Sequence, residues 1–130
     1  MEQLQPEQRR AITELARAHD WRLVVLFGSM ARDGVGRDVD LAVQPVTPPD
    51  LMTQGRWQNK LESVLEPVPV DLVVLHDGTS PLTRFEIFRD GICLHEAEAG
   101  LFHAEQDRAF FLHADSVLFQ LHEQDDPDAA

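Results

Sequence analysis

The sequence is poor in cysteine and in positive charge. Its only cysteine, Cys93, excludes an intrachain disulfide and a cysteine-ligated zinc site, and a reducing cytoplasmic compartment is the default expectation. The chain has 11 lysine and arginine residues against 23 acidic residues, for a net charge of −12. Because affinity for nucleic acid comes mainly from cations on phosphates, we expect no direct binding of duplex nucleic acid. Binding to anionic membranes is disfavoured for the same reason.

Long hydrophobic runs are also missing. No apolar segment approaches the roughly 20 residues of a membrane span, and the polar first ten residues do not resemble a signal peptide. The chain has 130 residues, of which 43% are hydrophobic. This length and composition predict a single globular domain with its own core.

Segments with helical periodicity alternate with short apolar segments, which predicts a mixed α/β (α+β) domain. Pro6 in a first turn, Asp50 as a cap, and Ser80 as a cap followed by Pro81 mark the starts of three helices. We expect a core over residues 1–96, a C-terminal helix over 97–123 and an acidic tail over 124–130. Helices are expected over 6–18, from 50 to about 66, from 81 to 91 and from 98 to about 121. Strands are expected over 22–27, 39–43, 70–75 and 92–96.

The most informative segment is LFGSMARDGVGRDVDL, from Leu26 to Leu41. A strand ends at Gly28 and Ser29, where glycine lets the backbone approach a ligand and the amides of a short helix would face a phosphate. A loop then leads to Asp38 and Asp40, which point to the same face because they lie two residues apart on a strand. The segment predicts a phosphate-accepting turn beside a pair of carboxylates.

A third carboxylate, Asp71, interrupts the next apolar strand and joins the same face if the two strands are neighbours. Three clustered acids repel one another, which raises their pKa values unless a cation neutralises them. Oxygen-only ligands suit Mg²⁺, which takes one or two carboxylates plus substrate phosphates. Asp38, Asp40 and Asp71 are therefore candidate metal ligands and catalytic residues for nucleotidyl transfer by paired metals.

This pattern resembles the signature of the minimal nucleotidyltransferases of the DNA polymerase β superfamily: Gly-Ser, a spacer, Asp-x-Asp and a third Asp on a later strand. The spacer here has eight residues where family members mostly have ten, and Arg37 stands where they tend to have serine. The resemblance covers about residues 8–96. The residues that match are Gly28, Ser29, Ala31, Arg32, Asp38, Asp40 and Asp71.

The resemblance implies a minimal nucleotidyltransferase fold, with a small mixed sheet of about four strands flanked by helices. It implies that Asp38 and Asp40 hold two Mg²⁺ ions, and that Asp71 holds the catalytic ion and helps to activate an acceptor hydroxyl. The hydroxyl would attack the α-phosphate of ATP, and pyrophosphate would leave. The implied nucleotide-binding residues are Gly28 and Ser29, for the β- and γ-phosphates, and Arg32, which either contacts the nucleotide or supports the loop. Arg37 departs from the family pattern and is a further nucleotide-binding candidate, which either reaches a phosphate or pairs with a carboxylate.

Stand-alone chains of this size in the family are commonly the antitoxin of a two-gene pair, whose toxin is a small helical RNase of the HEPN type. The resemblance implies transfer of AMP to a tyrosine of such a toxin. The acidic charge suits a basic partner, and because the chain contains no tyrosine, that acceptor must lie in another molecule. Two alternatives stay open: an antitoxin that acts by binding only, and transfer to a small molecule such as an aminoglycoside.

The last helix is unusually apolar. At about 100° per residue its apolar side chains cover roughly 220°, whereas a stripe that faces a core needs little over 100°. The helix either packs across the sheet or contacts a partner, which could be the toxin or a second copy of the chain. The apolar residues are Leu101, Phe110, Phe111, Leu112, Val117, Leu118, Phe119 and Leu121.

Overall fold

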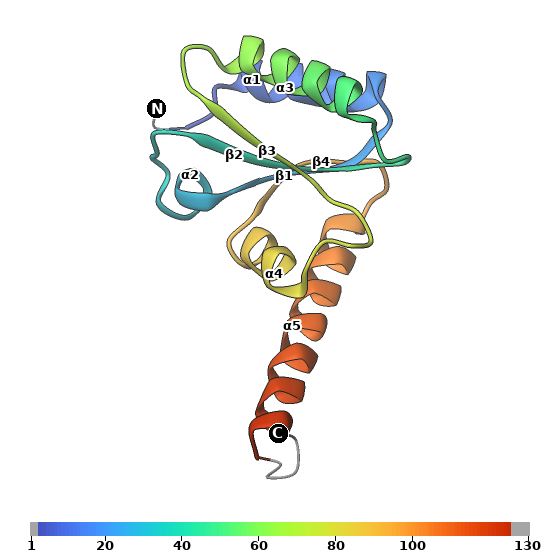
Figure 1. Cartoon of the computed structure of the whole chain (residues 1–130). Helices are drawn as coiled ribbons and strands as arrows, with labels where there is room; N and C mark the ends of the chain where they lie inside the picture. The colour runs from blue at the N-terminus through green and yellow to red at the C-terminus, as the bar shows by residue number, and fades with distance from the viewer. Residues whose placement is uncertain (1–2, 126–130) are drawn as a thin grey trace.

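The computed structural model describes residues 3–125, which form a four-stranded mixed sheet with helices on both faces (Figure 1). The strand order is β3-β2-β1-β4, in which β1 runs antiparallel to β2 and β4, and β3 runs parallel to β2. The mixed α/β fold expected from the sequence is confirmed. The elements are α1 (Pro6–Ala18), β1 (Trp21–Phe27), α2 (Gly28–Asp33), β2 (Val39–Pro45), α3 (Leu51–Leu65), β3 (Val70–Val74), α4 (Pro81–Arg89), β4 (Ile92–Glu96) and α5 (Leu101–Asp125).

The sheet separates two hydrophobic layers. On one face Leu41 and Val43 of β2 pack with Leu61 of α3 and with α1. On the other face Ala42 of β2 packs with Phe88 of α4 and with the start of α5. Because side chains alternate along a strand, the acidic positions of β2 and β3 project from the face that α4 partly covers. Figure 1 shows α4 and α5 on that face and α1 and α3 on the other.

Side chains at the helix starts confirm two of the expected caps. Asp50 Oδ1 accepts a hydrogen bond from the Thr53 N–H at 2.7 Å, and this bond lowers the pKa of the Asp50 carboxyl. Ser80 Oγ accepts from the Thr83 N–H at 3.2 Å at the start of α4. Each cap satisfies a backbone N–H that has no partner within its helix.

The turn before α5 shifts the start of that helix from the expected residue 98 to Leu101. Gly100 adopts a φ of 88°, in the left-handed region that favours glycine. Glu96 accepts hydrogen bonds from the Phe102 N–H at 2.9 Å and from the Gly100 N–H at 3.2 Å. The helix continues to Asp125 and so includes the first two residues of the expected tail. Residues 126–130 of that tail lie outside the described part of the chain.

Replacing Glu96 by glutamine is expected to lower the melting temperature by about a few degrees at neutral pH. The N–H groups of Phe102 and Gly100 hold the pKa of the Glu96 carboxyl below its usual value. A carboxyl whose pKa is lower in the folded state stabilises the fold above its unfolded pKa of about 4.3, and that contribution is lost as pH falls through the folded pKa. The difference in melting temperature between wild type and variant should therefore close in acid.

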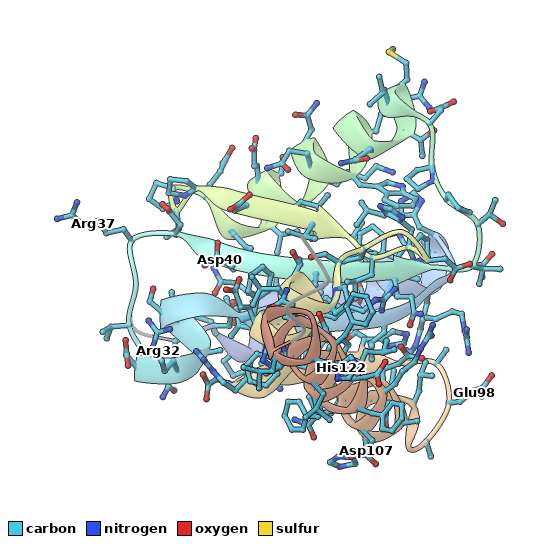
Figure 2. All side chains as sticks on the ribbon, turned by 60° about the horizontal axis from the view of Figure 1, so that its bottom comes forward. Arg32, Arg37, Asp40, Glu98, Asp107 and His122 are labelled. Atoms are coloured by element: carbon cyan, nitrogen blue, oxygen red, sulfur yellow. The ribbon has the colours of Figure 1, made fainter. Side chains whose placement is uncertain are left out.

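Thermal unfolding followed by circular dichroism from pH 7 to pH 3 measures this difference. Glu98→Gln is the matched control, because the Glu98 side chain points away from the domain (Figure 2). A difference between wild type and Glu96→Gln that stays constant down to the lowest pH would show that the charge of Glu96 does not stabilise the start of α5.

Only the first part of α5 packs against the domain. Phe102 and Ala109 are buried, and His113 stacks on Phe85 of α4 with ring centroids 4.0 Å apart. The rest of the helix extends beyond the domain (Figure 1), and Phe111 and Leu118 are 72% and 65% exposed. The helix therefore does not lie across the sheet along its length. Within residues 3–125, no helix is long and apolar enough to cross a membrane.

Candidate active site

The turn between β1 and α2 lies directly against β2. Phe27, the last residue of β1, pairs with Asp40 in the antiparallel ladder. The next residue, Gly28, has a φ of 74°, and a Cβ atom at this position would overlap Oδ2 of Asp40. Glycine is therefore required here both by the backbone conformation and by the carboxylate that lies against it.

The structure brings the three predicted acids together on one face of the sheet. Asp40 and Asp71 lie opposite each other in the parallel ladder between β2 and β3. Asp38 immediately precedes β2 and is exposed, as is Asp71, whereas Asp40 is half-buried. Burial raises the pKa of the Asp40 carboxyl, and the charges of Asp71 and Asp38 and a hydrogen bond with Asp71 raise it further.

The crowding of these acids is an electrostatic cost that a bound cation would offset. Among the residues that the structure describes, however, no group of three His, Cys, Asp or Glu side chains is close enough together to hold a metal ion as it stands. The assignment of metal ions to Asp38, Asp40 and Asp71 therefore stays a prediction.

The eight-residue connection from Ser29 to Asp38 folds back on α2. The helix ends at Gly34, which has a φ of 78° and donates its N–H to the Met30 carbonyl at 3.0 Å. Gly36 then passes so close to α2 that a Cβ atom there would lie 2.6 Å from Oγ of Ser29. The sequence pattern does not reveal this contact, because nothing distinguishes Gly36 from an ordinary loop glycine.

The two predicted nucleotide-binding arginines lie in different places. Arg32 is four residues after Gly28 and thus on the same side of α2, and both residues line a pocket of about 280 Å³. Arg37 is exposed in the loop. Figure 2 shows Arg37 pointing outward, away from Asp40. The structure therefore places Arg32 in the pocket at the Gly28 turn, with its Nε 3.6 Å from Oδ2 of Asp33, and does not bring Arg37 to the acidic residues.

The same pocket has a second wall that the sequence pattern did not predict. The last turn of α4 contributes Glu86 and Arg89, and Asp90 follows directly. In the sequence, Arg89 is an ordinary basic residue near the end of a helix, where a positive charge is favourable for the helix dipole. Its place in the same pocket as Arg32 depends on how α4 packs against the sheet.

The mixed four-stranded sheet, the Gly-Ser turn and the three acids on one face together define a nucleotidyltransferase domain. The model of the family described as "Polymerase beta, Nucleotidyltransferase" matches residues 10–99. The chain therefore belongs to the polymerase β nucleotidyltransferase family, and it is an enzyme of that class.

Solved structures share the fold. One is a toxin-antitoxin crystal structure with AMP-PNP, with a TM-score of 0.62 and 24% identity over 89% of each chain. Another is an MNT antitoxin in complex with the tri-AMPylated HEPN toxin of Shewanella oneidensis, with a TM-score of 0.58 and 24% identity over 90% of this chain and 87% of that chain. A third, from Shewanella oneidensis, has a TM-score of 0.63 and 17% identity over 92% of this chain and 99% of that chain. No curated protein matches the sequence significantly.

Proposed function

We propose that this chain transfers AMP from ATP to a hydroxyl of a partner protein, a HEPN-type toxin with a tyrosine acceptor, and so neutralises it. The observation that carries the proposal is the contact of Gly28 with Asp40, which itself faces Asp71 across the ladder. Phosphates held at the Gly28 turn would lie beside the acidic residues. The similar structures with AMP-PNP and with an AMPylated toxin support the choice of nucleotide and reaction.

The residues at the site fit Mg²⁺. Carboxylate oxygens are the ligands that this ion prefers, and Asp38, Asp40 and Asp71 supply them on one face of the sheet. Burial raises the pKa of Asp40 most, and the charges of Asp71 and Asp38 raise it further; a divalent cation would relieve this repulsion. When bound, two Mg²⁺ ions would neutralise phosphate charge and lower the pKa of the attacking hydroxyl.

The residues of the chain have distinct tasks in this reaction. Asp71 is exposed on β3, an edge strand, where an incoming hydroxyl can reach it and lose its proton to the carboxylate. The resulting oxygen attacks the α-phosphorus, and the bond from that phosphorus to the bridging oxygen of pyrophosphate breaks. Gly28 and Ser29 hold the β- and γ-phosphates, and Arg32 binds beside them.

An acceptor protein needs a docking surface, and α5 offers one. We call its exposed apolar residues the α5 apolar surface. A second copy of the chain would bring another net charge of −12, which opposes self-association, whereas a basic partner would be attracted. The toxin is therefore favoured over a homo-oligomer at this surface. Its members are Phe110, Phe111, Val117, Leu118, Phe119 and Leu121.

The α5 apolar surface also favours a second candidate, in which the chain neutralises the toxin by binding alone. Contact through α5 would not need the acidic residues, because the exposed part of the helix extends away from the sheet that carries them (Figure 1). The two candidates differ in what they require of Asp38.

Incubation with ATP labelled at the α-phosphate, Mg²⁺ and the toxin tests the proposal. Wild type should label the toxin, and Asp38→Asn should label it at least about 100-fold more slowly, because the variant loses a ligand of the proposed Mg²⁺ site and with it the charge stabilisation that the metal supplies. Asp77→Asn, at an exposed acid after β3, is the matched control. Neutralisation without any label would establish the binding-only antitoxin. Label found only in a small molecule from a cell extract would establish the aminoglycoside-type reaction instead.

A further inference from the structure

The pocket between α2 and α4 adjoins the acidic residues. Its wall from β1 and α2 consists of Phe27, Gly28 and Arg32. Phe27 pairs with Asp40, and Gly28 lies against the Asp40 carboxylate. Through Gly28 the pocket therefore adjoins the Asp40 carboxylate, and it extends to the end of α4.

Arg89 lines this pocket from the last turn of α4. Its Nε donates to Asp90 Oδ2 at 3.0 Å, and its guanidinium carbon lies 5.7 Å from the centroid of the Phe85 ring. The side chain is 49% exposed, so a ligand can reach it. A guanidinium group has five N–H donors and only one of them is on Nε, and the terminal nitrogens form the paired hydrogen bonds that phosphates accept.

We propose that Arg89 binds the terminal phosphates of the nucleotide in this pocket from α4, while Arg32 lines the same pocket from α2. The inference rests on the proposed function. It follows from the elements involved: Gly28 belongs to the turn assigned to the β- and γ-phosphates, Arg32 lies in the last turn of α2, and both line the pocket. The α-phosphate then lies toward Asp40 and Asp71, where the acceptor arrives.

The charges of the pocket explain why it would accept a triphosphate rather than any anion. Glu86 and Asp90 balance the charges of Arg32 and Arg89, so the lining residues have no net charge. A free anion gains little there, whereas a nucleotide already held at the Gly28 turn brings its terminal phosphates within reach of both guanidinium groups. Arg89 would also stabilise the negative charge that develops on pyrophosphate as it leaves.

Arg89→Gln tests the proposal through binding of AMP-PNP and of AMP in the presence of Mg²⁺, measured by calorimetry. The variant should bind AMP-PNP at least about 10-fold more weakly, as expected for lost charge-assisted hydrogen bonds, and bind AMP within about two-fold of wild type. Arg56→Gln on α3, which covers the other face of the sheet, should change neither affinity.

Asp90→Asn separates direct contact from a structural role. It removes the same ion pair as Arg89→Gln but keeps the guanidinium group, so AMP-PNP should bind as tightly as to wild type or more tightly. An Arg89→Gln variant that weakens AMP and AMP-PNP equally, or neither, would overturn the proposal, as would an Asp90→Asn variant that loses AMP-PNP as Arg89→Gln does. A wild-type protein that does not bind AMP-PNP would instead overturn the proposed function. Arg89→Lys, which keeps the charge without the paired donors, should fall between wild type and Arg89→Gln.

Discussion

Asp40→Asn is expected to abolish the rise in melting temperature that Mg²⁺ with AMP-PNP gives to the wild-type protein. A ligand at 100 times its dissociation constant stabilises the folded state by about 2.7 kcal/mol, which corresponds to a rise of several degrees. Asp40 lies between the other two acids and against Gly28. Its loss therefore removes a ligand from the centre of the proposed metal site.

The same substitution should leave the ligand-free protein as stable as wild type, or more stable. Asparagine keeps the shape of the side chain but removes a negative charge that burial, Asp71 and Asp38 all disfavour. A variant that fails to respond only because its fold is damaged would instead have a lower melting temperature than wild type without ligand. Asp77→Asn, at an exposed acid after β3, should respond to the ligand as wild type does. An Asp40→Asn variant with the wild-type response would refute the metal assignment.

Replacing Phe111 and Leu118 together by serine is expected to weaken binding of the toxin by about 100-fold or more. The two residues lie seven positions apart, on one side of α5, and are 72% and 65% exposed. Burying one such side chain contributes about 1.5–3 kcal/mol, so losing two removes most of an apolar contact. The melting temperature of the isolated chain should hardly change, because neither side chain is buried in it.

Calorimetry with the purified toxin measures this effect, and Leu51→Ser on α3 is the matched control, since Leu51 is 88% exposed. Unchanged affinity of the double variant would show that the toxin binds elsewhere. If wild type sediments as a dimer and the double variant as a monomer, the α5 apolar surface joins two copies of the chain instead.

The sequence predicts the order and type of the elements because their signals are local. Apolar alternation identifies β2, and Asp50 and Ser80 mark the starts of α3 and α4. The sequence predicts the start of α5 three residues too early, because Glu96 accepts hydrogen bonds from the N–H groups of Gly100 and Phe102. These two hydrogen bonds fix the first turn of the helix, and no local sequence pattern predicts them.

In the candidate site, too, some contacts follow from local sequence spacing and others depend on the tertiary fold. The spacing of Asp38 and Asp40 alone predicts that they lie together, whereas the meeting of Asp40 with Asp71 depends on the parallel pairing of β2 and β3. From the sequence alone, we expect Asp71 to join the other two acids only if β2 and β3 are neighbours. Arg89 reaches the site through the packing of α4 against the sheet, which brings it into one pocket with Gly28 and Arg32 from a distant part of the sequence. Such contacts leave no periodic signal in a single sequence.

The most direct test of the central claim is the intact mass of the toxin after production together with this chain. With wild type, the toxin should be heavier by one or more whole AMP groups, located on tyrosine by fragmentation. With Asp71→Asn, which removes the group proposed to take the proton of the hydroxyl, the toxin should keep its unmodified mass. A toxin that is neutralised by wild type yet carries no added mass would contradict nucleotidyl transfer as the means of neutralisation.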